Sequence, residues 1–196
     1  MFDKDSLAAK IFPYAKWGMY GLLFLNMILF FKNQTIDEGI DSLVWLILLL
    51  LLERETSQMG QDYKSEAEKY LLQTGRFIAY ILIFYSAYEY GSVSYMDENG
   101  GLDFVNAVLW IIVVLLIEYE IFYEKKFHQF AVKIFSFLKI SLYIGLFIIA
   151  ILWQLNGEWL DFYDAALWIV CFFFIELNIL QFEDKISEEG TTYEGY

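Results

Sequence analysis

The chain has 196 residues, of which 59% are hydrophobic and 20% aromatic, and its mean hydropathy is +0.46. Soluble domains average about 45–50% apolar residues, so this composition is typical of an integral membrane protein. The formal charge of -13 excludes the basic surface of a nucleic-acid-binding protein. One cysteine and one histidine exclude an intrachain disulfide and a Cys/His zinc site.

Apolar residues occur in six blocks that alternate with short polar segments. A helix rises about 1.5 Å per residue, so spanning a hydrocarbon core about 30 Å thick takes about 20 residues. Most of the blocks approach that length, which predicts an all-α integral membrane protein with six transmembrane helices. The blocks are 11–31, 40–52, 77–96, 102–117, 134–155 and 162–182. The acidic segment 183–196 that follows them is predicted to be disordered.

One pattern occurs three times, in the second, fourth and sixth blocks. It begins with a tryptophan, continues through seven apolar residues to a glutamate, and ends on a polar residue two positions later. An Asp or Asn stands four residues before each tryptophan, and an acid stands seven residues before it. This recurrence predicts a single transmembrane domain of three parallel two-helix hairpin repeats with pseudo-threefold symmetry. The repeats are 10–55, 75–120 and 133–178.

The repeated polar residues fall on one side of each helix. At about 100° per residue, the upstream acid, the Asp or Asn and the tryptophan form one stripe, and the two inner polar residues flank it. If the three stripes face a common axis, they form rings of acids, as in pores that select cations, with tryptophans as a gate. The candidate ion-site residues are Asp41, Asn106, Asp164, Glu53, Glu118, Glu120 and Glu176. The tryptophans, Trp45, Trp110 and Trp168, form this gate or are packing residues and interfacial anchors.

Charged residues also fall within the expected membrane depth. Asp41 and Glu53 are separated by only about 18 Å of helix, so at least one of them is drawn inward. Lys16 precedes Glu53 by the same spacing that separates Lys139 from Glu176. We therefore predict two structural ion pairs, Lys16–Glu53 and Lys139–Glu176, with snorkelling of both groups to water as the alternative.

The second repeat departs from this pattern. An alignment without gaps places Ile81 where the other repeats have lysine, so Glu118 is expected to have no cation of its own. The same alignment places Glu89 in the middle of the third block, opposite phenylalanines. Glu89 is therefore the strongest single candidate for a mid-membrane ion-binding carboxylate. The alternative is a protonated glutamate that bonds to a Tyr or Ser hydroxyl.

The distribution of Lys and Arg predicts the orientation. The turns after the odd blocks contain Lys32 alone, whereas the other connecting segments are rich in Lys and Arg. The positive-inside rule therefore places both termini in the cytoplasm.

These observations lead to two functional hypotheses. The first is a channel or transporter for small cations or protons that uses intramembrane carboxylates. The second is a non-catalytic structural or regulatory subunit of a membrane complex, or a homo-oligomer. No hydrolase motif or phosphate-binding loop occurs, so we do not expect an enzyme or a cofactor, and no metal ligands are assigned. The lipid bilayer is the one partner that both hypotheses require.

Overall fold

A computed structural model describes residues 7–58, 63–123 and 129–193. All regular secondary structure in these ranges is helical, so the all-α prediction is confirmed. The helices are α1 (Leu7–Asn33), α2 (Ile36–Thr56), α3 (Glu66–Tyr90), α4 (Val93–Asn99), α5 (Leu102–Tyr123), α6 (Gln129–Asn156) and α7 (Trp159–Tyr193).

Four of the described helices are long and apolar enough to cross a membrane. Their apolar segments are Pro13–Asn33, Leu102–Ile121, Ile134–Asn156 and Trp159–Leu180, in α1, α5, α6 and α7. This supports the prediction of an integral membrane protein. Helices α2 and α3 are long enough but not apolar enough, because charged residues flank the short apolar stretch of α2 and the first half of α3 is polar.

The ends of two predicted segments differ from expectation. The third apolar block was expected to be continuous to Met96, but α3 ends at Tyr90 and the separate short helix α4 follows. Ser92 caps α4 by accepting a hydrogen bond from the backbone N–H of Tyr95. The residue between the two helices is Gly91, and a Cβ at this position would lie 2.8 Å from the ring of Phe104. The second difference is that α7 continues to Tyr193, into the segment for which we predicted disorder.

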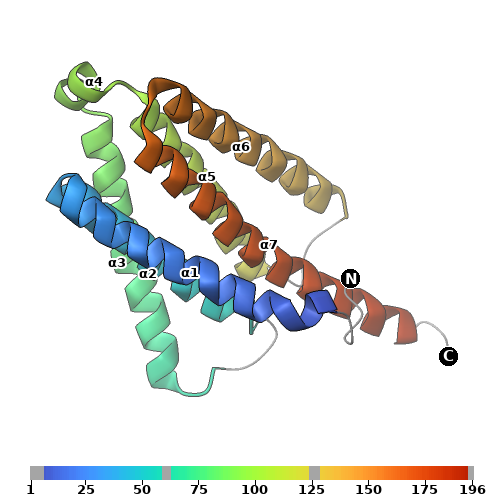
Figure 1. Cartoon of the computed structure of the whole chain (residues 1–196). Coiled ribbons are helices and arrows are strands. Elements are labelled where there is room, and N and C mark those ends of the chain that lie inside the picture. Colours follow the sequence, from blue (N-terminus) through green and yellow to red (C-terminus); the bar gives the residue numbers. More distant parts are fainter. Residues whose placement is uncertain (1–6, 59–62, 124–128, 194–196) are drawn as a thin grey trace.

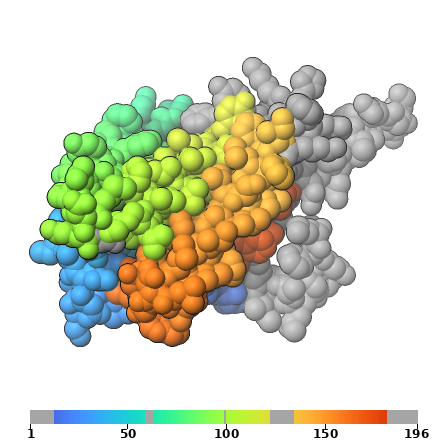
Figure 2. Space-filling model, turned by 90° about the horizontal axis from the view of Figure 1, so that it is seen from above, coloured from blue at the N-terminus to red at the C-terminus, as the bar shows by residue number. Residues whose placement is uncertain are grey.

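The six long helices form a closed ring in which each helix contacts the next. The order around the ring is α1, α2, α3, α5, α6 and α7, and α7 contacts α1. The α1–α2 turn, α4 and the α6–α7 turn gather at one end of the molecule (Figure 1). In the view from above, α5 and α6 lie side by side on one face of the ring (Figure 2).

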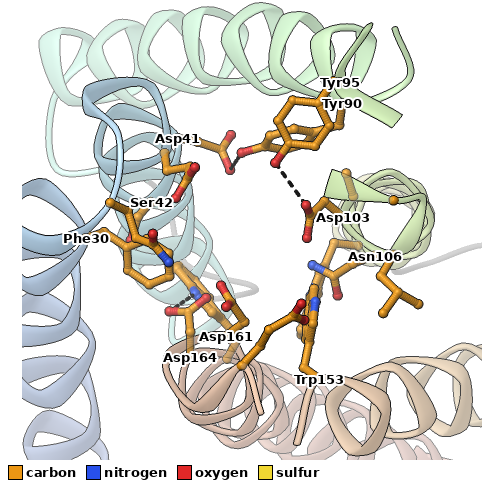
Figure 3. Close-up of a pocket in the computed structure, with 18 of the residues that line it drawn as sticks. Phe30, Asp41, Ser42, Tyr90, Tyr95, Asp103, Asn106, Trp153, Asp161 and Asp164 are labelled. Atoms are coloured by element: carbon orange, nitrogen blue, oxygen red, sulfur yellow. Dashed lines mark hydrogen bonds between the residues drawn. The ribbon is translucent and has the colours of Figure 1, made fainter. Parts of the chain in front are cut away.

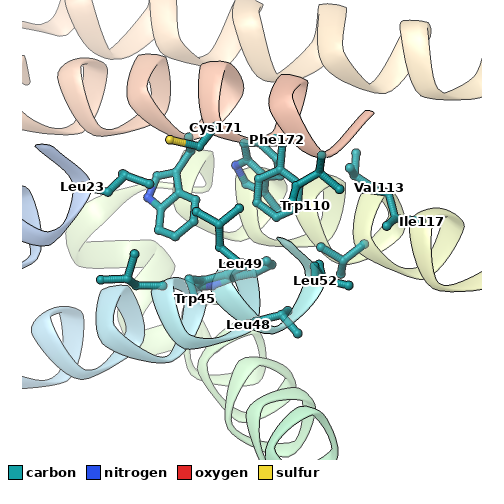
Figure 4. Close-up of a cluster of buried hydrophobic side chains, with 14 of the residues drawn as sticks. Leu23, Trp45, Leu48, Leu49, Leu52, Trp110, Val113, Ile117, Cys171 and Phe172 are labelled. Atoms are coloured by element: carbon teal, nitrogen blue, oxygen red, sulfur yellow. The ribbon is translucent and has the colours of Figure 1, made fainter. Parts of the chain in front are cut away.

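A dry apolar core fills the centre of this ring. Side chains of α2, α5 and α7 that are entirely buried supply it (Figure 4). They occupy the same three positions after each repeated tryptophan, on one face of each helix. These residues are Leu48, Leu49, Leu52, Val113, Val114, Ile117, Cys171, Phe172 and Ile175.

Candidate functional site

A pocket opens among the turns at one end of the helix ring (Figure 1). Its volume is about 560 Å³. All three kinds of residue in the repeated stripe line it: the upstream acids, the Asp/Asn residues and the tryptophans. These are Glu38, Asp103, Asp161, Asp41, Asn106, Asp164, Trp45, Trp110 and Trp168. With Glu98 and Glu158, the described lining has seven carboxylic acids and no Lys, Arg or His. We call this cavity the acidic pocket (Figure 3).

The three repeated tryptophans close the inner end of the acidic pocket. The Trp45 ring centroid lies 6.4 Å from that of Trp110 and 6.3 Å from that of Trp168. Phe172, in the dry core, contacts both Trp110 and Trp168, with centroid distances of 4.7 and 6.1 Å. Such tilted and edge-to-face contacts between aromatic rings are favourable. The pocket therefore ends at this tryptophan floor, with the packed core beneath it.

The Asp/Asn residues lie just above the floor, and each has a different environment. Asp164 accepts hydrogen bonds from Asn26 at 2.7 Å and from the Trp168 indole at 3.0 Å. Asp41 accepts one from the Tyr90 hydroxyl at 3.2 Å. The Oδ1 atoms of Asp41 and Asn106 are buried without a hydrogen-bond partner in the described structure. Two acceptor atoms beside the pocket therefore have no hydrogen-bond partner among the described residues.

The upstream acids lie nearer the pocket mouth. The Tyr95 hydroxyl of α4 donates a hydrogen bond to Asp103 at 2.9 Å. Burial raises the pKa of Glu38, and the negative charge of Asp103 adds to the effect, while hydrogen bonds from Thr35 oppose it. Burial and the Asp103 charge likewise raise the pKa of Tyr95. Carboxylates are therefore close together at the pocket mouth, and a bound cation would reduce the repulsion between them.

The inner carboxylates have a different environment from the outer ones. They lie eight or more residues beyond the tryptophans, about 12 Å along each helix, on the far side of the dry core. There they bond to basic side chains, tyrosines and one asparagine in an arrangement that we call the ionic belt. Its members are Lys16, Tyr20, Glu53, Glu55, Arg76, Tyr80, Glu118, Glu120, Lys139, Tyr143, Glu176 and Asn178.

The first cluster of the belt is centred on Glu53. Lys16 forms an ion pair with Glu53 Oε1, and the Tyr20 hydroxyl donates to Oε2 at 2.8 Å. Asn178 of α7 donates to the same Oε2 at 3.0 Å. The predicted partners Lys16 and Glu53 are therefore adjacent, and the last polar residue of the third repeat joins them.

The second cluster corrects the prediction for Glu118. Arg76 donates to Glu118 Oε2 at 2.9 Å, and the Tyr80 hydroxyl donates to Oε1 at 2.7 Å. Arg76 also forms an ion pair with Glu55 of α2. Burial raises the pKa of Glu55, and the neighbouring Arg76 guanidinium acts against this rise. Glu118 therefore has a cation, and the expectation of uncompensated charge in the second repeat was wrong.

The third cluster is centred on Lys139. Its ammonium group forms ion pairs with Glu176 and with Glu120, the latter at 2.8 Å. The Tyr143 hydroxyl donates to Glu176 Oε1 at 3.2 Å. Glu176 and Glu120 thus bond within the belt, and neither lines the acidic pocket.

The three clusters share one spacing, which explains why the alignment without gaps failed. In each, a Lys or Arg precedes the tyrosine by four residues. The tyrosine precedes its glutamate by 33 residues in the first and third clusters but by 38 in the second. The extra residues fall in the interval that contains α4. The repeated motif Lys/Arg-x-x-x-Tyr was visible in the sequence, and allowing one gap would have found it.

The same shift changes the interpretation of Glu89. With the gap, Phe84 rather than Glu89 aligns with Phe24 and Phe147, and all three phenylalanines are exposed on the outside of the ring. Glu89 lies exposed in the last turn of α3 and does not line the acidic pocket. The structure therefore separates Glu89 from the other candidate residues.

Aromatic residues of α1, α3 and α6 complete the pocket wall, and sequence reasoning missed them. Phe30, Tyr90 and Trp153 line the pocket and each lies ten residues after the tyrosine of its belt cluster.

Among the described residues, no group of three or more His, Cys, Asp or Glu side chains is arranged to hold a metal ion. No known protein family, curated protein or solved structure matches this chain.

Proposed function

We propose that the chain crosses the membrane six times, as three parallel hairpins around a pseudo-threefold axis. The hairpins are α1–α2, α3–α5 and α6–α7, with α2, α5 and α7 nearest the axis. The closed order of helix contacts supports this arrangement, as does the recurrence of the belt clusters. In two of the clusters the cation also binds the last polar residue of the preceding repeat, Glu55 at Arg76 and Glu120 at Lys139. Both termini are then cytoplasmic, and the acidic pocket opens outside.

We further propose that the protein is a channel or transporter for small cations or protons, and that the acidic pocket is its external vestibule. The observation that carries this proposal is the lining of seven carboxylic acids without a described basic side chain. A concave surface of one sign focuses the electric field and raises the local concentration of counterions. Rings of carboxylates use the same effect to select cations at a pore mouth.

The tryptophan floor and the dry core form the closed gate of this pathway. Entirely buried side chains such as Leu48, Val113 and Phe172 leave no wet path below Trp45, so passage requires α2, α5 and α7 to separate. The ionic belt on the far side opposes that movement, because breaking a buried ion pair costs about 3–5 kcal/mol. The inner glutamates then serve as closing contacts rather than as ion ligands.

Flux measurements on purified protein in liposomes test the proposal. The variant Asp103→Asn/Asp161→Asn removes two mouth charges with little change of shape and should lower cation flux several-fold. Glu89→Gln is the matched control, because this exposed residue lies outside the pocket. If wild-type protein passes no cation or proton under any gradient, the transport proposal fails.

The second hypothesis, a non-catalytic subunit or homo-oligomer, keeps one observation in its favour. The axis is filled by apolar side chains and the inner carboxylates are buried in ion pairs, as in a rigid structural element. This hypothesis leads if flux is absent and the protein purifies as a stable oligomer or with a membrane partner. In neither case do we assign an enzymatic activity or a cofactor.

A further inference from the structure

We infer that the acidic pocket binds an organic polyamine, with ammonium groups at the carboxylates and the methylene chain against the aromatic walls. This inference rests on the proposed function and names the chemical class of its cation. Four features of the pocket carry it: its size, the spread of its acids, its aromatic lining and the nature of its unsatisfied atoms.

The size of the pocket fits a small organic molecule better than a bare ion. Ligand sites for such molecules have volumes of about 300–1,000 Å³, and the acidic pocket has about 560 Å³. A water molecule takes up about 30 Å³, so a single metal ion would leave most of the pocket to solvent. The described acids are not grouped as metal ligands either.

The spread of the acids favours several positive charges on one flexible chain. Asp41 is on α2, Glu98 on α4, Asp103 on α5 and Asp161 on α7, so the carboxylates surround the cavity rather than converge on a point (Figure 3). A ligand with one ammonium group would compensate one or two of them. A polyamine can place successive ammonium groups at separate carboxylates.

The aromatic lining suits the apolar part of such a ligand. Three tryptophans form the floor, and Phe30, Tyr90 and Trp153 stand on the wall above it. Aromatic faces attract ammonium groups through cation–π interactions and also pack against methylene groups. A hydrated metal ion gains little from these surfaces.

The unsatisfied atoms at the pocket point to a ligand that donates hydrogen bonds. Asp41 Oδ1 and Asn106 Oδ1 are both acceptors, and both are buried without a partner in the described structure. A buried polar atom without a partner is costly. An ammonium group carries donors only, as the lysine side chain does. Both oxygens have almost no exposed surface, so an ammonium group in the pocket reaches them only when the side chains that cover them move.

Intrinsic tryptophan fluorescence offers a direct binding assay. Four of the six tryptophans line the pocket, whereas Trp17 and Trp159 are exposed elsewhere. Spermidine should change the emission saturably, with a dissociation constant confirmed by titration calorimetry. Magnesium chloride at the same ionic strength should give no saturable change.

Two sets of variants separate charge from shape. Asp103→Asn/Asp161→Asn should weaken spermidine binding at least about tenfold, since hydrogen bonds to charged groups are strong. Trp153→Leu should also weaken it, whereas Trp153→Phe, which keeps an aromatic face, should retain it. Glu89→Gln should leave it unchanged, and circular dichroism checks that each variant is folded.

Each outcome distinguishes the inference from the proposed function. Saturable binding of spermidine that is lost in Trp153→Leu and kept in Trp153→Phe supports the inference. If magnesium binds as well as spermidine and Trp153→Leu binds like wild type, the pocket recognises charge alone and the inference is overturned, while cation flux can still stand. If folded wild-type protein neither binds spermidine nor passes any cation, both proposals fail.

Discussion

Replacing Arg76 by methionine should be among the most destabilising single changes in this protein. Arg76 is only 6% exposed and contacts two carboxylates from different helices, Glu55 and Glu118, which are 8% and 9% exposed. Methionine retains the apolar stem of the arginine but removes its charge and all five of its donors. Both glutamates then remain buried without their cation.

The magnitude follows from the number of contacts broken. Removing one partner of a buried ion pair costs about 3–5 kcal/mol, because the remaining charge is left unpaired. The Tyr80 and Tyr63 hydroxyls still donate to Glu118 and Glu55, which limits the loss at each carboxylate. We therefore expect Arg76→Met to lower the free energy of unfolding by about 3–5 kcal/mol.

Thermal or denaturant unfolding in detergent, followed by circular dichroism, measures this loss. Arg54→Met is the matched control, because its ion pair with Glu68 is partly exposed and solvent-exposed pairs contribute little to stability. Adding Glu55→Gln and Glu118→Gln to Arg76→Met should recover much of the stability, since the unpaired charges are then gone. Equal losses for Arg76→Met and Arg54→Met would refute the reasoning.

Three further predictions concern the Lys16–Glu53 ion pair, the pH dependence of stability and the orientation in the membrane. Lys16→Met should destabilise more than Lys16→Met/Glu53→Gln in a double-mutant cycle, and strictly additive effects would contradict a coupled pair. Burial raises the pKa of Glu38 in the folded protein. The contribution of Glu38 to stability is therefore fully present below the ordinary Glu pKa of about 4.3 and is lost as pH rises through the raised pKa. Glu38→Gln should flatten this part of the curve of stability against pH. In a Cys171→Ala background, Gln34→Cys should react with an impermeant maleimide in intact cells, and labelling only after lysis would reverse the proposed orientation.

The sequence by itself determined the helices and the columns of residues on α2, α5 and α7. Hydrophobic periodicity is a local property, since 3.6 residues per turn decide which side chains share a face. The interval of four residues from Asp41 to Trp45, found again before Trp110 and Trp168, was therefore enough to place carboxylates and tryptophans on one stripe. The equal spacing of Lys16–Glu53 and Lys139–Glu176 in the first and third repeats predicted that Lys16 neighbours Glu53.

The tertiary structure showed which register of α3 applies, and it alone decided the environment of each carboxylate. The short helix α4 lengthens the second repeat, so Arg76 rather than Ile81 reaches Glu118, and a chain compared without gaps cannot reveal this. Glu118 and Asp103 lie on the same helix, yet one is buried in an ion pair and the other lines a cavity. Whether a carboxylate finds a cation or water depends on which neighbouring helix lies opposite it, and helix packing brings together residues far apart in the chain.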